Sequence, residues 1–274
     1  MTRLQWQLAA IVGGVALGCA PSASAQTVIA LENPGFEADG APIGGFPVLV
    51  PQGWSLYDPA GIVDQSSNAV GVLRPEGTTF FAEPVPEGNN VALIYLEQRA
   101  GTIVAGDPVG LVGSFAGVAQ ADTRYTLTVQ VGNIASGTGL GGYAGFGFSN
   151  LSGFPGYRIE LLADGQVVAV DHNSLGLAIG EGQFMATSME WTPGAGDPLV
   201  GSTLGVRLIN LNAFGNLDER AREVDFDQVQ LVATAVPEPP AVALWMGGLA
   251  ACLLLRARRR PWRLRPLVPP PAAH

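Results

Sequence analysis

Residues 125–131 read Tyr-Thr-Leu-Thr-Val-Gln-Val, with apolar and polar side chains in strict alternation. Such alternation places Tyr, Leu and Val on one face of a β-strand and Thr and Gln on the other. The stretch therefore predicts a strand with one buried face, which is typical of antiparallel sheets. Outside two apolar terminal segments no helical period is sustained over several turns, so the domain between them is predicted to be mostly β.

Similar runs recur along the chain and are separated by glycine and proline, the residues that favour turns. Asp164-Gly165 is a preferred pair for a two-residue type I′ turn, so the runs on either side of it are predicted to form a hairpin. About nine or ten such runs predict an all-β fold, an antiparallel β-sandwich of the jelly-roll type. The other candidate strands are residues 28–31, 54–57, 91–97, 111–119, 157–163, 166–171, 184–191, 204–210 and 224–231.

The last of these runs changes phase in its middle. Val224 and Phe226 share one face, whereas Val229 and Leu231 fall in the opposite phase. A β-bulge at Asp227-Gln228 would restore the register, and bulges often adjoin functional sites.

The domain is delimited as residues 26–235 and contains no cysteine, which excludes disulfides, cysteine-based zinc sites and cysteine nucleophiles there. It carries 22 acidic residues against 7 arginines, a net charge of −15, whereas the whole chain has a formal charge of −9. Nucleic acid is therefore not expected as a partner. Such a surface suits solubility and divalent cations.

The N-terminal residues 1–25 are predicted to be a secretory signal peptide. Met1-Thr2-Arg3 supplies a positive start, residues 8–17 an apolar core, and Ala23-Ser24-Ala25 a small-residue cleavage site. Lipid attachment at Cys19 is the alternative, although the residues before it fit a lipoprotein signal poorly. Export through the inner membrane is therefore expected.

Residues 236–260 combine a proline-rich motif, an apolar run and an arginine cluster, followed by a cytoplasmic tail at 261–274. The apolar run at 241–255 predicts one short transmembrane helix, and the arginines hold its far end in the cytoplasm. The prolines favour an extended backbone that an enzyme could read outside the bilayer. A plain single-pass anchor is the alternative. The motif is Val236, Pro237, Glu238 and Pro239, and the cluster contains Arg258, Arg259 and Arg260.

This order of features resembles the PEP-CTERM sorting signal of Gram-negative bacteria. The resemblance implies that an exosortase, a membrane cysteine protease-transpeptidase, cleaves near the Pro-Glu-Pro motif and passes the protein to the cell surface or extracellular matrix. It also implies a link with exopolysaccharide and biofilm. The leading hypothesis is a non-enzymatic exported surface or matrix protein that is held in the inner membrane only during sorting.

A second resemblance lies at the two ends of the domain. Residues 31–37, Leu-Glu-Asn-Pro-Gly-Phe-Glu, and the closing run Val-Asp-Phe-Asp-Gln-Val-Gln-Leu are similar to the first and last strands of galactose-binding-like carbohydrate-binding modules. The resemblance implies a structural calcium ion held by Glu37 and Asp227, although both could be ordinary solvated carboxylates. A sugar-binding role would require exposed aromatic rings, for which Tyr143 and Trp54 are the candidates.

Catalytic signatures are weak in this sequence. The chain has two histidines and no G-x-S-x-G elbow, which disfavours a serine hydrolase. Residues 137–142 satisfy G-x-G-x-x-G, but no helix-forming sequence follows to bind a dinucleotide. We therefore expect no enzymatic activity, with a carbohydrate-binding module as the alternative and a polysaccharide-active hydrolase as the least favoured hypothesis.

Overall fold

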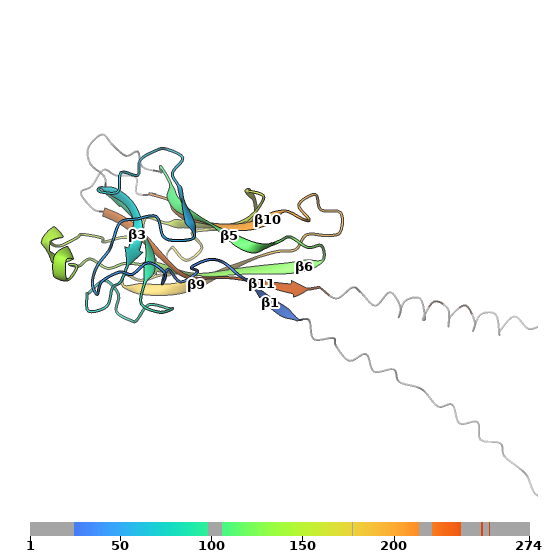
Figure 1. The fold of residues 1–274 in the computed structure, drawn as a ribbon, viewed down its shortest axis with the longest axis horizontal. Helices are drawn as coiled ribbons and strands as arrows, with labels where there is room; N and C mark the ends of the chain where they lie inside the picture. Colours follow the sequence, from blue (N-terminus) through green and yellow to red (C-terminus); the bar gives the residue numbers. More distant parts are fainter. Residues whose placement is uncertain are drawn as a thin grey trace, which may run out of the picture.

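The computed structural model describes residues 25–97, 106–176, 178–213 and 221–236, together with positions 248 and 252. The described domain consists of eleven strands and one 3-10 helix, with the strands in two layers packed face to face (Figure 1). The elements are β1 (Gln26–Ile29), β2 (Trp54–Tyr57), β3 (Asn68–Leu73), β4 (Val91–Glu97), β5 (Val109–Val118), β6 (Thr123–Asn133), η1 (Gly141–Phe146), β7 (Tyr157–Ala163), β8 (Gln166–His172), β9 (Gln183–Trp191), β10 (Thr203–Asn210) and β11 (Ala221–Ala235).

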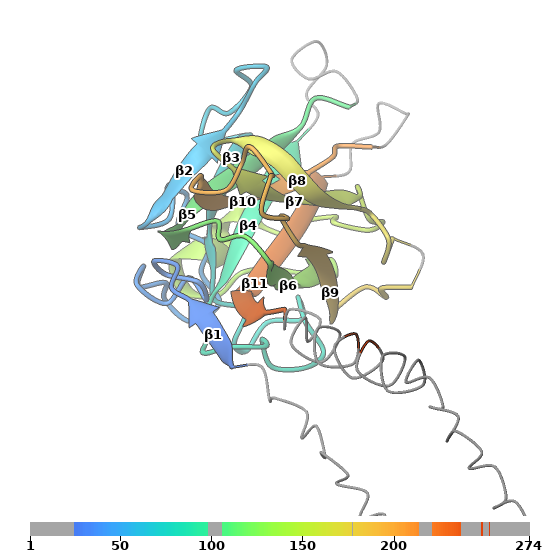
Figure 2. The same ribbon diagram turned by 90° about the vertical axis from the view of Figure 1, so that its right-hand side faces the viewer.

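One layer is a six-stranded sheet in the order β3-β4-β11-β6-β9, with β1 added beside β11. The other layer is a five-stranded sheet in the order β2-β5-β10-β7-β8. All pairings between these strands are antiparallel. Figure 2 shows β6 and β9 of the first layer below β7 and β8 of the second. The predicted antiparallel β-sandwich is therefore confirmed.

The core lies between the two sheets, and β6 shows why the sequence forms it. Tyr125, Leu127, Val129 and Val131 are buried in the main core cluster, while the polar residues between them face outward. The strand extends further than residues 125–131, but the predicted alternation of faces is confirmed. Burial of each such side chain contributes about 1.5–3 kcal/mol relative to exposure.

Two local predictions are also confirmed. Asp164 and Gly165 have φ angles of +46° and +78°, the left-handed conformations that a type I′ turn requires. The pairing of β11 with β6 shifts register between Asp227 and Gln230, which is the predicted bulge. Gln228 has a φ angle of +48° at this point.

The sequence analysis missed β3. All six of its residues are buried, because β4 lies beside it, the core lies on one face and a loop covers the other. A strand buried on both faces has no alternation to detect. Gly71 is needed there because a Cβ atom would lie 2.5 Å from the carbonyl oxygen of Pro47.

Both ends of the domain lie at the same end of the sandwich. Gln26 of β1 pairs with Thr234 of β11, so the start of β1 and the end of β11 lie together, at the end of the sandwich opposite η1 (Figure 1). Within the described ranges, no helix has the length and apolar character needed to cross a bilayer. The predicted signal peptide falls outside the described residues apart from Ala25. The predicted transmembrane helix falls outside them apart from Gly248 and Cys252.

Candidate active site

Part of the outer face of the six-stranded sheet, around β3 and β4, is covered by loops. A second apolar cluster, here the outer cluster, joins side chains of this face to side chains of three loops. The largest contribution comes from residues 74–90, between β3 and β4, which we name the covering segment. The buried members of the outer cluster are Leu73, Phe80, Val91, Leu93, Ile134 and Leu151, and the partly buried ones are Phe46, Phe81, Val85, Tyr95 and Phe184.

Two acids of β11 lie on this covered face. Val224 and Phe226 belong to the core between the sheets, so alternation turns Glu223 and Asp225 to the outer face. Asp225 pairs with Leu93 of β4 on one side, and Glu223 pairs with Tyr95. Asp225 is 0 % exposed and Glu223 is 6 % exposed, so both carboxyl groups lie beneath the outer cluster.

Asp225 is buried with little compensation. Apart from the adjacent carboxyl group of Glu223, neither of its carboxyl oxygens has a hydrogen-bond partner within the part of the chain that the structure describes. Burial raises the pKa of Asp225 well above its usual value, and the negative charge of Glu223 and a hydrogen bond with it raise this pKa further. Burial likewise raises the pKa of Glu223, to about 7. A raised pKa favours the protonated form of Asp225, which is able to donate its proton.

A glycine beside Asp225 makes room for an aromatic ring. Gly132 of β6 pairs with Asp225 on one side and with Phe184 of β9 on the other. A Cβ atom at Gly132 would lie 2.6 Å from the ring of Phe184 and 3.0 Å from the Cβ atom of Asp225. The Phe184 ring therefore lies over Gly132, next to the acid. Phe81 of the covering segment stacks on this ring with centroids 4.4 Å apart.

A cavity of about 310 Å³ lies at the covering segment. Its lining residues fall between Pro75 and Asn89 and include Phe81 and Val85, which also pack in the outer cluster. Asp225 is not among the lining residues. The lining also includes polar residues, among them Glu76, Glu83 and Asn89, so the cavity is mixed in character. The site therefore has this cavity on one side of the Phe81–Phe184 stack and a buried acid on the other.

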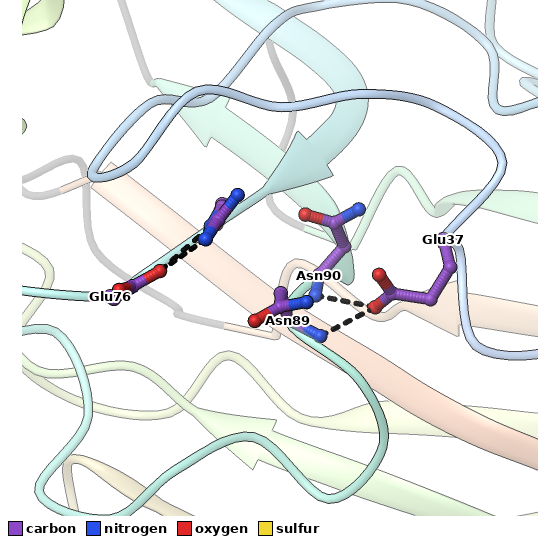
Figure 3. Close-up of polar contacts among 5 residues, drawn as sticks. Glu37, Glu76, Asn89 and Asn90 are labelled. Carbon is purple, nitrogen blue, oxygen red and sulfur yellow. Dashed lines mark hydrogen bonds and ion pairs between the residues drawn. The ribbon is translucent and has the colours of Figure 1, made fainter.

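The two residues predicted to hold calcium contact the end of the covering segment. Oε1 of Glu37 accepts hydrogen bonds of 2.7 Å from the backbone N–H groups of Asn89 and Asn90 (Figure 3). Oδ2 of Asp227 accepts a 2.8 Å hydrogen bond from the N–H of Glu87. Glu37 and Asp227 are far apart in the sequence, and both accept hydrogen bonds from the same loop.

A metal site is not formed by these residues in the described structure. Within the described ranges, no group of three or more His, Cys, Asp or Glu side chains is arranged to hold a metal ion. Burial raises the pKa of Asp227 to about 7, backbone hydrogen bonds from Glu87 and Gln228 lower it, and the charges of Glu87 and Glu37 raise it. Calcium binding at Glu37 and Asp227 therefore stays a prediction.

The two aromatic residues proposed for ligand binding have different surroundings. Trp54 is buried, stacks on Phe36 at 5.1 Å, and donates a 3.1 Å hydrogen bond from Nε1 to the carbonyl oxygen of Asn33. Tyr143 lies on η1, with its ring centroid 4.7 Å from that of Phe46. Phe46 packs in the outer cluster, so Tyr143 lies at its edge, whereas Trp54 belongs to the core.

The predicted sorting motif is described at its first residue only. The N–H of Val236 donates a 2.9 Å hydrogen bond to the carbonyl oxygen of Asp122, so β11 is tied to the domain at its end. Pro237, Glu238, Pro239 and the cluster of Arg258, Arg259 and Arg260 lie outside the described residues.

A second buried aspartate has full hydrogen bonding. Asp171 of β8 accepts hydrogen bonds on Oδ2 from the hydroxyls of Tyr157 (2.6 Å), Ser174 (2.9 Å) and Thr187, and on Oδ1 from the N–H of Ser174 (3.0 Å). Tyr157 and Thr187 belong to different sheets, so this cluster joins the two layers. Burial alone would raise the pKa of Asp171, but the hydrogen bonds hold it below its usual value.

Sequence reasoning did not identify Glu223 and Asp225 as site residues. Alternation along the last strand places Asp225 on the face opposite to Val224 and Phe226. The available signal was the pair of acids at 223 and 225, which alternate with these two apolar residues. That signal becomes specific only when the outer face is known to be covered.

The chain is similar in sequence and in fold to known proteins. The family model described as HpiC1 cyclase, HpiC1-like, matches residues 27–232. An apo-form cyclase from Fischerella sp. is similar, with 35 % identity, a TM-score of 0.63, and 78 % of this chain and 98 % of that chain covered. No match was found among curated proteins.

Two further solved structures contain small molecules. The Stig cyclase Fisc from Fischerella sp. TAU, in complex with (3Z)-3-(1-methyl-2-pyrrolidinylidene)-3H-indole, is 33 % identical, with a TM-score of 0.63 and coverage of 78 % of this chain and 100 % of that chain. A cyclase from Fischerella sp. TAU in complex with 4-(1H-indol-3-yl)butan-2-one is 34 % identical, with a TM-score of 0.63 and coverage of 77 % and 100 %.

Proposed function

The chain belongs to the HpiC1-like cyclase family, and on that premise we propose that it closes a ring in an apolar substrate by proton transfer from Asp225. The observation that carries this proposal is the carboxyl group of Asp225, which is fully buried and has no hydrogen-bond partner among the described residues apart from the adjacent Glu223. A buried carboxyl group with so little compensation costs stability and is a marker of function.

Family membership corrects several expectations from the sequence. The identification as a PEP-CTERM protein with a carbohydrate-binding domain was wrong, because the family matched over residues 27–232 is one of cyclases. The expectation of a non-enzymatic surface or matrix protein was wrong for the same reason. The expected partners, exosortase and exopolysaccharide or other glycans, were also wrong. Two of the similar cyclases are bound to small indole compounds instead. Terminal motifs are short and independent of the domain between them, so they gave no information on its chemistry.

The chemical step assigned to Asp225 is general acid catalysis. Its O–H bond breaks as the proton adds to one carbon of a substrate double bond, and a C–H bond forms. The cation left on the neighbouring carbon is attacked by a second double bond of the same molecule, which closes the ring. The ring closure leaves a cation on a carbon of the second double bond. Loss of a proton from the cyclised cation to the carboxylate breaks a C–H bond, forms a new double bond and restores the acid, so the product is an isomer of the substrate.

The surroundings of Asp225 suit a cationic intermediate. The outer cluster excludes water that would otherwise capture the cation, and the faces of Phe184 and Phe81 stabilise positive charge through their π electrons. Glu223, two residues away on the same face, keeps the proton on Asp225 while the site is empty. These features favour an aromatic, largely apolar substrate, and an indole compound is the class suggested by the similar cyclases.

The test is conversion of an indole compound that carries an alkene side chain, using the full chain. We expect a product of unchanged mass that contains one more ring, with deuterium taken up when the reaction runs in D₂O. Asp225→Asn keeps the size of the side chain but removes the acid, so turnover should fall on the order of 10²–10⁴-fold.

Glu190→Gln is the matched control, because Glu190 is an exposed carboxylate on β9 of the same sheet. This variant should keep turnover within about twofold of the wild type. Undiminished turnover in Asp225→Asn, or a product that has gained water, would refute the assigned step.

Calcium is a separate proposal and takes no part in this step. The carboxyl groups of Glu37 and Asp227 lie close together at the end of the covering segment, where repulsion from Glu37 raises the pKa of Asp227, and a cation there would offset this repulsion. Thermal unfolding of the full chain with calcium and with EGTA tests it, since an ion that binds only the folded state raises the melting temperature once its free concentration exceeds its dissociation constant. Equal melting temperatures would count against a structural ion.

A further inference from the structure

We propose that Phe81 and Phe184 form the gate between the cavity and Asp225, and that Phe81 decides how large a ring system reaches the acid. This inference rests on the proposed function of Asp225 as the proton donor. It assigns the cavity as the entry chamber of the substrate. The chemical class it fits is a planar aromatic molecule of the size of an indole.

The position of the two rings carries this inference. Phe81 lines the cavity of about 310 Å³, and its ring stacks on Phe184 with centroids 4.4 Å apart and planes 30° apart. The ring of Phe184 lies over Gly132, the residue that pairs with Asp225 across β11 and β6. The cavity, Phe81, Phe184 and the acid are therefore neighbours in that order.

The backbone on both sides of Phe81 is fixed. The carbonyl oxygen of Phe80 accepts a 2.9 Å hydrogen bond from the N–H of Ala135, and the N–H of Ala82 donates a 3.0 Å hydrogen bond to the carbonyl oxygen of Gly182. These two hydrogen bonds hold the covering segment to the loop after β6 and to the loop before β9. Opening this gate requires rotation of the Phe81 side chain and not movement of the segment, and such rotations are fast.

A substrate ring would take the place that Phe81 occupies. Phe184 offers a flat face for stacking, and ring pairs contribute about 0.5–1.5 kcal/mol beyond the burial of their surface. Replacement of Phe81 by the substrate exchanges one stacked pair for another, so entry costs little. A fused ring system larger than indole would meet the remaining wall of the cavity around Val85.

The experiment measures binding by calorimetry, which does not require turnover. The probes are 4-(1H-indol-3-yl)butan-2-one and its benzindole analogue, which has one more fused ring. The proteins are the full chain, Phe81→Ala, Phe81→Trp and the control Phe146→Ala, whose side chain is 74 % exposed and does not line the cavity.

Phe81→Ala should bind the benzindole about tenfold more tightly relative to the indole probe than the wild type does. Phe81→Trp should shift this ratio in the opposite direction, and Phe146→Ala should leave it within about twofold. Opposite shifts distinguish a gate from general loss of folding, which would weaken binding of both probes in both variants.

Equal effects on the two probes, or shifts of the same sign in Phe81→Ala and Phe81→Trp, would overturn the gate. Absence of binding of the indole probe to the wild-type chain would overturn it too. The proposed function fails separately, when Asp225→Asn turns over substrate as fast as the wild type. The two proposals are therefore tested by different measurements.

Discussion

Asp225 and Asp171 are both buried, at 0 % and 7 % exposure, yet their surroundings are opposite. Asp171 lies between the two sheets and accepts hydrogen bonds from three side chains and one backbone N–H. Asp225 lies on the outer face of one sheet and has no hydrogen-bond partner among the described residues apart from the adjacent acid Glu223. The pKa is held below its usual value for Asp171 and raised well above it for Asp225.

The difference shows that burial alone does not identify a functional acid. A buried carboxylate with all its hydrogen bonds made stabilises the fold, because its partners replace the water it has lost. A buried carboxyl group without partners costs stability, and it persists where catalysis uses it. The comparison can be tested by removing either aspartate.

Removal of Asp171 should have the largest effect. Asp171→Ala leaves the hydroxyls of Tyr157 and Thr187 buried without their acceptor, at the junction of the two sheets. We expect a loss on the order of 3 kcal/mol in the free energy of unfolding. Urea unfolding followed by fluorescence measures it, and a loss below about 1 kcal/mol would show that the cluster adds little.

The pH dependence of stability should have opposite signs for the two residues. The folded pKa of Asp171 lies below its reference value of 3.8, so its contribution is present above about pH 4 and is lost as the pH falls through the folded value. The folded pKa of Asp225 lies above 3.8, so the folded state holds an extra proton and stability falls as the pH rises from about 4 toward that value.

Each such group changes the free energy of unfolding by at most about 1.4 kcal/mol per pH unit within its window. Asp225→Asn should flatten the decline above pH 4, although Glu223 and Asp227, whose pKa values are also raised, contribute to it. Asp171→Asn should flatten the rise below pH 4. Identical profiles in the two variants would contradict the contrast.

Asp225→Asn should also stabilise the protein at pH 7, by about 1 kcal/mol. The carboxyl group of Asp225 is ionised in the unfolded chain at pH 7 and must take up a proton on folding, whereas an amide has no such cost. Thermal unfolding measures this gain, and the same preparation serves for the activity assay. A gain in stability together with a loss of turnover is the expected signature of a functional acid. If the variant is less stable than the wild type, Asp225 stabilises the fold, as Asp171 does.

Tyr157→Phe should have the smallest effect, about 1 kcal/mol of destabilisation. It removes the 2.6 Å hydrogen bond to Asp171 and the weaker 3.3 Å hydrogen bonds of the same hydroxyl with the Ser174 hydroxyl and the N–H of Leu175, but it leaves the bonds from Ser174 and Thr187 to Asp171 in place. Urea unfolding of this variant beside Asp171→Ala gives the contribution of one hydroxyl group to the cluster. Tyr57→Phe is the matched control. Tyr57 belongs to the same sheet as Tyr157, but its ring packs against Arg207, at 4.4 Å, and not against Asp171.

The sequence predicted most of the sandwich, because glycine and proline separate runs that are either apolar or alternate between apolar and polar side chains. Residues 54–57, 91–97 and 157–163 coincide with β2, β4 and β7, and the hairpin at Asp164-Gly165 and the bulge after Asp227 are as expected. Local patterns are sufficient for such features. β3 was missed because six consecutive buried residues carry no alternation.

The candidate site could not be predicted in the same way. Asp225 becomes an unusual acid only because the outer cluster covers it, and that cover comes from loops distant in the sequence, around Phe46, Phe81 and Ile134. No local pattern indicates that a sheet face will be covered. Glu37 and Asp227 were paired through a family resemblance, and they do meet at one loop, at Glu87 and Asn89.

The pairing of β1 with β11 has a practical consequence for building altered forms of this protein. Cα atoms paired across antiparallel strands lie about 5 Å apart, so Gln26 and Thr234 could be joined by a short linker. New chain ends could then be opened in a hairpin loop such as the one at Gly165, giving a circular permutant. The start of β1 and the end of β11 lie opposite η1 (Figure 1), so a fluorescent reporter fused at either of these domain ends would not obstruct the covering segment.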